Sequence, residues 1–244
     1  MISAVTSSSD ACSLLPHMID EIGALRGADL ARLRNLRREC SRRLRDAGSR
    51  SVLRLACELK NSGIVHRFFS DELIANHKGA MECLTRLDLE QIGAGMDSWD
   101  QVDSFATIVA GPAWRAGRIG DADVAKWARS RDRWWRRAAL VCTTKLNVIG
   151  TNGDAHRTLS ICKMLLGDHD DMIVKAMSWA LRALAKRNPE QTAAFIERHR
   201  ERLHSRVVRE VGNKLRTGLK NPPSRKTTIL SAKNDGAFTA KRRE

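Results

Sequence analysis

The stretch that decides the fold reads Asp171-Met-Ile-Val-Lys-Ala-Met-Ser-Trp-Ala-Leu-Arg-Ala-Leu-Ala-Lys186. An α-helix turns by about 100° per residue, so side chains three and four positions apart share one face. One such stripe consists of the apolar residues Ile173, Met177, Ala180 and Leu184. The opposite face carries, at the same spacing, Lys175, Trp179, Arg182 and Lys186. The stretch therefore predicts an amphipathic helix with a core face and an aromatic, basic face.

The same helical pattern extends from about Met18 to Arg216, with short breaks at Gly, Asp, Asn or Pro. We find no alternating run enriched in β-branched residues, so no strands are expected. Residues that favour helix starts recur at Asp71, Ser98 with Gln101, Asp121, Asp154, and Asn188 followed by Pro189. The fold class that this predicts is all-α.

Helices joined by short turns form about five or six antiparallel pairs, with a repeat of about 35–45 residues. This length is typical of HEAT-class solenoids, which bind extended partners on their concave side. A closed helical bundle is the alternative. Residues 13–218 are expected to form the single domain. Residues 1–12 are expected to lack fixed structure, and residues 219–244 to form a basic flexible tail.

The charge balance points to a polyanionic partner. The 244 residues contain 43 Lys+Arg against 28 Asp+Glu, a formal net charge of +15. Such a chain attracts nucleic acid, because neutralised phosphates release counterions; a merely soluble basic protein is the alternative. No apolar run approaches the roughly 18 residues of a membrane span, and the N-terminus lacks a secretory signal. We expect a cytoplasmic protein without a membrane partner.

Metal and disulfide chemistry are not expected. The 6 cysteines are scattered singly with no CxxC pair, which favours reduced thiols in helices. The 7 histidines show no ligand spacing such as HExxH. The sequence therefore predicts no metal and no cofactor.

A second basic and aromatic stretch lies at residues 130–146. The expected core stripe consists of Trp135, Ala139, Cys142 and Leu146. A different face carries Trp134, Arg137 and Val141, with Arg133 one turn before Arg137. Arg137 is a candidate for holding a phosphate, and a surface salt bridge is its alternative.

The third stretch begins at Ser98. Its expected core stripe is Val102, Phe105 and Val109, whereas Trp99 and Asp103 lie one turn apart on another face. Asp103 lies beyond the first turn, so the helix dipole does not account for it. It either pairs with an arginine or does chemistry.

Three segments together resemble the AlkD-like DNA alkylation repair glycosylases. They are Trp99-Asp100-Gln101-Val102-Asp103-Ser104, Trp134-Trp135-Arg136-Arg137-Ala138-Ala139, and Lys175-Ala176-Met177-Ser178-Trp179-Ala180-Leu181-Arg182. The resemblance covers about Leu53 to Lys220. It implies a right-handed, all-α solenoid of HEAT-like pairs whose concave basic face holds duplex DNA. The activity implied is hydrolysis of the N-glycosidic bond of purines alkylated at N3 or N7, leaving an abasic site, by a monofunctional glycosylase of base excision repair.

Carried over to this sequence, the resemblance makes Asp103 the catalytic residue and gives DNA contacts to Trp99, Arg137 and Trp179. The basic faces described above add Lys175, Arg182 and Arg133 as DNA-binding residues. The expected partner is double-stranded DNA carrying alkylated bases, bound by a monomer associated with the nucleoid. Two alternatives stay open. One is a non-catalytic HEAT-like DNA-binding protein, and the other is a scaffold that binds protein on its concave side.

Overall fold

The structure, a computed structural model, describes residues 11–25, 29–64 and 66–223. Within these ranges all regular secondary structure is helical, which confirms the predicted all-α class. The predicted flexible segments fall largely outside them, at residues 1–10 and 224–244. A short helix already begins at Ala11, whose side chain is buried, two residues before the predicted domain boundary.

The helices occupy most of the described chain. In chain order they are η1 (Ala11–Leu14), α1 (Leu15–Gly23), α2 (Leu30–Arg43), α3 (Ser49–Asn61), α4 (Arg67–Ala75), α5 (Lys78–Glu82), α6 (Arg86–Gly93), α7 (Trp99–Ser104), η2 (Phe105–Ala110), α8 (Gly111–Arg115), α9 (Asp121–Ala128), α10 (Arg133–Cys142), η3 (Thr143–Leu146), α11 (Ala155–Met164), α12 (Asp171–Ala185), α13 (Pro189–Arg198) and α14 (Ser205–Thr217). The elements η1 and η3 are 3-10 helices, and η2 is π-helical.

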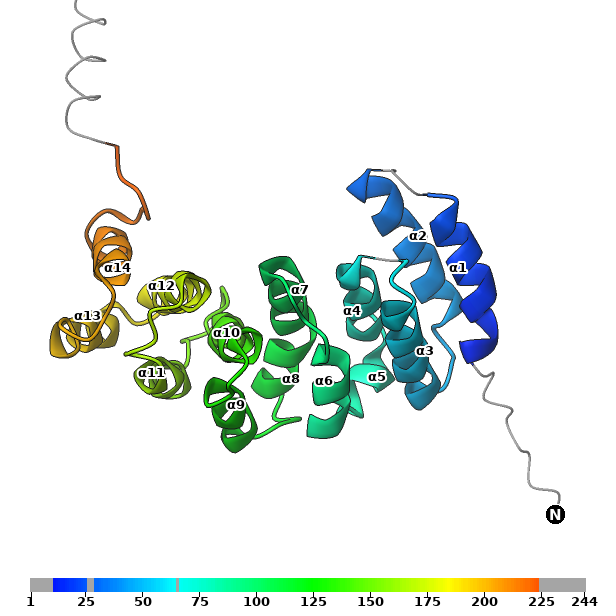
Figure 1. Ribbon diagram of the computed structural model, residues 1–244, viewed down its shortest axis with the longest axis horizontal. Coiled ribbons are helices and arrows are strands. Elements are labelled where there is room, and N and C mark those ends of the chain that lie inside the picture. The colour runs from blue at the N-terminus through cyan, green and yellow to red at the C-terminus, as the bar shows by residue number, and fades with distance from the viewer. Residues whose placement is uncertain (1–10, 26–28, 65, 224–244) are drawn as a thin grey trace, which may run out of the picture.

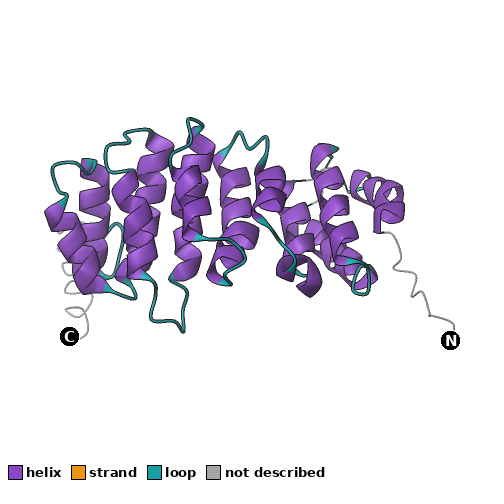
Figure 2. Ribbon diagram, turned by 90° about the horizontal axis from the view of Figure 1, so that it is seen from below, coloured by secondary structure: helices purple, strands orange, loops and turns teal. Residues whose placement is uncertain are grey.

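The helices form an elongated, curved array rather than a closed bundle (Figure 1). Along its concave side runs an inner row made of α2, α4, α7, α10, α12 and α14, in which each helix contacts the next. The remaining helices lie behind this row (Figures 1 and 2). This arrangement presents one continuous curved face, built from segments far apart in the sequence.

The predicted core stripes are buried between the helices. Val102, Phe105 and Val109 have no exposed surface, and the α12 stripe of Ile173, Met177, Ala180 and Leu184 is buried as well. Val174, Ala176, Ser178 and Leu181 are also buried, because α12 contacts α10, α11, α13 and α14. The solvent-facing side of α12 is therefore narrower than its sequence pattern indicated.

Trp135 lies at the edge of the core rather than inside it. Its ring meets Phe105 edge-on at 5.8 Å between centroids and lies 5.2 Å from the Trp127 ring. The ring also covers Gly93 so closely that any Cβ there would collide with it. Trp135 is half-buried, yet it closes the seam between α6, α9 and α10.

Most helix starts agree with the sequence. Asp154 and Asn188 are N-caps whose side chains accept from the backbone N–H of Arg157 and Gln191. Asp71 is a correction: it lies in the middle of α4, where its side chain is only 1% exposed. The helix begins one turn earlier because Phe69 and Leu73 already belong to its buried face.

Truncation of Trp135 should weaken the fold. We expect Trp135→Ala to lower the free energy of unfolding by about 3 kcal/mol, because it removes a large packed ring. Leu87→Ala, which removes an exposed side chain of α6, should change it by no more than about 0.5 kcal/mol. Urea denaturation of both variants measures the difference, and equal losses would contradict this packing.

Candidate functional site

The centre of the inner row holds an ion pair between α7 and α10. Arg137 donates from Nε to Oδ1 of Asp103 at 3.0 Å and from Nη2 to Oδ2 at 2.8 Å. The side chain of Arg137 is 6% exposed and that of Asp103 is 18% exposed. This two-pronged geometry is the strongest form of arginine–carboxylate contact and fixes the plane of the carboxylate.

The same guanidinium reaches a third helix. Nη1 of Arg137 donates to the backbone carbonyl of Met172, in the first turn of α12, at 2.6 Å. Arg137 thus connects α7, α10 and α12. We expected Arg137 to hold a phosphate, but its side chain already makes three hydrogen bonds within the protein. The alternative, a salt bridge, describes its environment more closely.

The Asp103 carboxylate feels two opposing influences. Burial raises its pKa above the ordinary value, and the hydrogen bonds and charge of Arg137 lower it. The charge of Asp100, one turn earlier, adds to the rise. Arg137 therefore opposes the protonation that the half-buried position of this carboxylate favours.

The backbone around Asp103 departs from a regular α-helix. The π-helical segment η2 follows α7 directly, and its Thr107 hydroxyl donates to the carbonyl of Asp103 at 2.7 Å. At the end of this segment Gly111 lies so close to the carbonyls of Ala106 and Cys142 that a Cβ there would clash. π-Helical turns are frequent at functional sites.

A buried carboxylate supports α7 from the other side. Asp71 of α4 accepts from the Ser104 hydroxyl at 2.6 Å, and its other oxygen has no hydrogen-bond partner among the described residues. Burial raises the pKa of Asp71 to about 6. Ser104 is the neighbour of Asp103, so α4 and α10 hold α7 between them. The sequence does not predict this contact, because its pattern indicates that Asp71 starts a helix.

The two predicted tryptophans differ in exposure. Trp99 begins α7, one turn before Asp103, and is 57% exposed. Trp179 is half-buried on α12, where it packs against the core while part of its ring stays accessible. Of the two tryptophans, Trp99 is therefore the one whose ring stays largely open to solvent, one turn from the Asp103 carboxylate.

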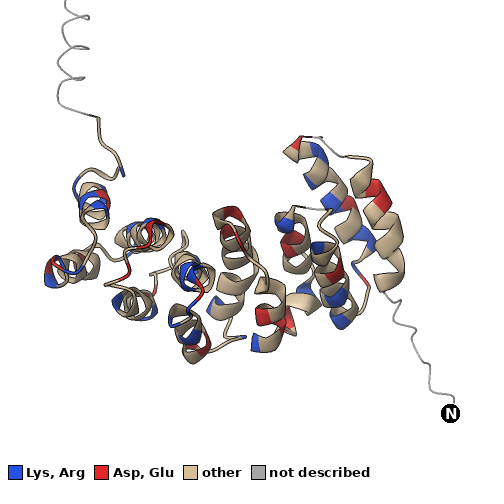
Figure 3. Cartoon of the chain, viewed as in Figure 1, with Lys and Arg blue, Asp and Glu red and all other residues tan. Residues whose placement is uncertain are grey.

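The predicted basic residues all lie on the inner row, and each has a polar partner. Lys175 pairs with Asp171 at 2.6 Å, and Arg133 pairs with Asp170 at 3.4 Å while its guanidinium lies over the Trp134 ring. Arg182 donates from Nε to the Ser178 hydroxyl at 3.2 Å. Figure 3 shows Lys and Arg on α10, α12 and α14, with acidic residues between them. A bound phosphate would compete with these partners.

The described residues contain neither a metal-binding cluster nor a membrane-spanning helix. No three or more His, Cys, Asp and Glu side chains gather there in a group that could hold a metal ion. None of the helices in this part of the chain is both long enough and apolar enough to cross a membrane.

Comparison with known proteins gives one family. A family model described as DNA alkylation repair enzyme matches residues 9–215, well over half of the chain. No curated protein matches the chain. The match confirms the family that the three sequence segments resemble, and it covers both Asp103 and Arg137.

A double-mutant cycle tests the Asp103–Arg137 pair. We expect Arg137→Met to cost on the order of 3 kcal/mol in free energy of unfolding, because it leaves a half-buried carboxylate unpaired. Adding Asp103→Asn to that variant removes the unpaired charge. The loss of unfolding free energy in the double variant should therefore be smaller than the sum of the losses in the two single variants, by about 1 kcal/mol or more. Additive losses in urea denaturation would show that the two side chains do not interact.

Proposed function

This chain belongs to the DNA alkylation repair enzyme family, and we propose that it is a monofunctional DNA glycosylase. It hydrolyses the N-glycosidic bond of purines alkylated at N3 or N7 in duplex DNA and leaves an abasic site. One observation carries the proposal: the half-buried carboxylate of Asp103, oriented by Arg137, lies one turn from the exposed Trp99 on the concave side of the array.

The reaction suits a site with one oriented carboxylate. Most glycosidases need an acid to protonate the leaving group and a second carboxylate at the sugar. A purine alkylated at N3 or N7 already carries a positive charge, so it leaves without that acid. What remains is to stabilise the positive charge that develops on the sugar and to orient a water, and Asp103 can do both.

The pairing with Arg137 is compatible with this role. Each oxygen of Asp103 accepts one hydrogen bond from Arg137 and retains further lone-pair capacity. The side chain is also 18% exposed, so those lone pairs remain within reach of a sugar or a water. We therefore assign Arg137 to positioning Asp103 and keeping it ionised, with its remaining N–H groups available to a phosphate.

The surrounding face supplies the DNA contacts. Trp99 would lie against the deoxyribose, where its ring face favours the developing cation, and the accessible part of Trp179 would take the other side. Phosphates would be held by Lys175, Arg182 and Arg133 after exchange with their present partners. Since these contacts read phosphates rather than base edges, binding should be insensitive to sequence and steeply dependent on salt.

We extend the proposal to the whole chain. The array is a right-handed solenoid of HEAT-like pairs that holds the duplex on its concave basic face. Residues 13–218, extended to Ala11 by the first helical turn, form the single domain. Most of the predicted basic tail, residues 219–244, lies outside the described residues. The protein acts as a monomer on nucleoid DNA in the cytoplasm and requires no cofactor.

A second candidate function rests on the ion pair itself. Both oxygens of Asp103 are engaged by Arg137, which is also what a purely structural salt bridge would require. In that case the protein is a non-catalytic DNA-binding member of the family. Release of 3-methyladenine and 7-methylguanine from alkylated duplex DNA, with undamaged duplex as control, separates the two. Release above the spontaneous rate supports the glycosylase, and binding without release supports the second candidate.

Removing the charge of Asp103 tests its catalytic role. We expect Asp103→Asn to slow single-turnover excision by about 100- to 1000-fold, the usual effect of losing electrostatic stabilisation of a transition state. Binding of undamaged duplex should be unchanged or tighter, because a negative charge near the phosphates is lost. Asp97→Asn makes the same change just before α7 and should excise at the wild-type rate. An unchanged rate in Asp103→Asn with a lowered melting temperature would make Asp103 purely structural.

The pH dependence of excision tests the role of Arg137. Activity requires ionised Asp103, so the rate should fall with decreasing pH at values above the ordinary aspartate range, because burial raises this pKa. Arg137 opposes the rise, so in Arg137→Met the fall should begin at higher pH. Single-turnover rates measured across pH 4–8, corrected for spontaneous base loss, give both midpoints. Coincident midpoints would mean that Arg137 does not tune the carboxylate.

A further inference from the structure

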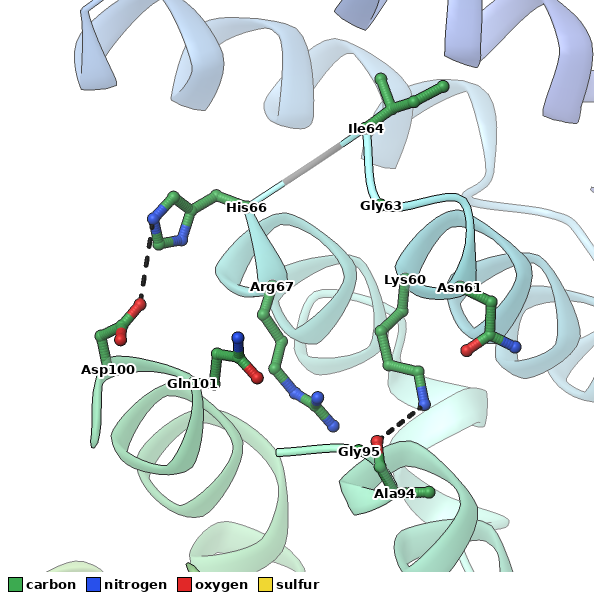
Figure 4. Close-up of a pocket in the computed structure, with 10 residues that line it drawn as sticks. All are labelled: Lys60, Asn61, Gly63, Ile64, His66, Arg67, Ala94, Gly95, Asp100 and Gln101. Atoms are coloured by element: carbon green, nitrogen blue, oxygen red, sulfur yellow. Dashed lines mark hydrogen bonds and ion pairs between the residues drawn. The ribbon is translucent and has the colours of Figure 1, made fainter. Parts of the chain in front are cut away.

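A polar cavity of about 570 Å³ lies beside the candidate site, on the α4 side of α7 (Figure 4). The end of α3, the start of α4, the loop after α6 and the first turn of α7 enclose it. The residues that line it include Lys60, Asn61, His66, Arg67, Asp100 and Gln101. Asp100 and Gln101 belong to the helix that carries Asp103, so the cavity and the candidate site share α7.

Two cations, Lys60 and Arg67, meet in this cavity with no carboxylate at ion-pair distance among the described residues. Neither Lys60 nor Arg67 forms an ion pair within the described part of the chain. Burial lowers the pKa of both side chains, and the charge of Arg67 lowers the pKa of Lys60 further. The charge of the buried Asp71 opposes both shifts, and that of Asp97 also opposes the shift of Arg67. Bringing like charges together in a partly dehydrated place is unfavourable unless something compensates them.

The carbonyl end of α6 compensates them only in part. Lys60 donates from Nζ to the carbonyl of Gln91 at 2.9 Å and to those of Ile92 and Ala94 at 3.4 Å. Arg67 donates from Nη2 to the carbonyl of Ile92. Cations favour a helix C-terminus, so these contacts have a structural explanation. They leave Nε of Arg67 without a partner, although this side chain is 93% buried, at 7% exposure. A buried donor without an acceptor indicates a missing partner.

Other groups around the cavity suit an anion. The N-cap of α4 is His66, whose side chain forms no capping hydrogen bond, so the positive end of this nine-residue helix is open. Figure 4 shows Arg67 and Lys60 extending side by side, with the amides of Asn61 and Gln101 flanking them. The nearby carboxylate of Asp100 lies 3.9 Å from the His66 ring, at the far side of the cavity from Lys60.

We propose that this cavity binds a phosphate group, with Arg67 and Lys60 as its cationic partners and the start of α4 as a further donor. The volume exceeds that of a phosphate alone and leaves room for an attached sugar. The phosphate comes either from a DNA strand that crosses α7 or from a free phosphate-bearing molecule. The DNA source rests on the proposed function, whereas phosphate binding itself does not.

Binding of inorganic phosphate to the full chain tests the proposal. Isothermal titration calorimetry should show saturable binding by the wild type. Asn61→Asp, which puts a negative charge at the exposed rim, should weaken it at least tenfold, and Lys60→Met should do the same. Asn152→Asp makes the same change in an exposed loop away from the cavity and should bind as the wild type does. Equal phosphate affinity in Asn61→Asp, Lys60→Met and Asn152→Asp would overturn the proposal.

A competition experiment identifies the source. If a DNA strand supplies the phosphate, undamaged duplex DNA should displace inorganic phosphate, and Asn61→Asp should weaken duplex binding more than Asn152→Asp. If a free molecule supplies it, phosphate should bind equally with and without duplex. Both outcomes support a phosphate site, and neither depends on base excision, so a failure of the proposed glycosylase activity would be recognised separately.

Discussion

The structure depends on the contact that Arg137 makes with Asp103 and with the carbonyl of Met172. Each of the three groups belongs to a different helix, and the three helices are consecutive members of the inner row. A guanidinium that is 6% exposed needs all of these acceptors to offset its lost hydration. The same requirement fixes the carboxylate in one orientation. Holding the array together and orienting Asp103 are therefore one interaction rather than two.

The sequence predicted the local structure well and the contacts between helices poorly. The stripes of Val102, Phe105 and Val109 could be identified because helical periodicity is a property of neighbouring residues. The Asp103–Arg137 pair joins positions 34 apart, and periodicity carries no information about such a distance. The prediction that Asp71 starts a helix is wrong for a related reason. An aspartate at a helix start and an aspartate buried against a serine of another helix cannot be told apart from the local sequence. Trp179 is half-buried because neighbouring helices pack against α12, and the sequence pattern does not place those neighbours.

The charge of the chain is distributed differently from what its total indicates. A net charge of +15 suggests a face of free cations, yet on the inner row the predicted phosphate-binding residues have partners of their own. Lys175 and Arg133 pair with neighbouring carboxylates at the start of α12. Such pairs are weak at an exposed surface and exchange readily for phosphates. Lys60 and Arg67, which form no ion pair within the described residues, instead line a cavity on the α4 side of α7.

The π-helical segment after Asp103 sets the angular register of the site. A π-turn closes its hydrogen bond one residue later than an α-turn, so η2 accommodates an additional residue between α7 and α8. In a regular α-helix of the same length, Asp103 would be rotated by about 100° relative to the buried Trp114 of α8, and it would no longer face α10. A chain one residue shorter in this segment would regain the present angle with an ordinary helix. Deleting one residue within Phe105–Ala110 would therefore turn the π-helical segment into an ordinary α-helix and leave the direction of the Asp103 carboxylate unchanged. Inserting one residue into such an α-helix would restore the π-helical segment, again without turning the carboxylate.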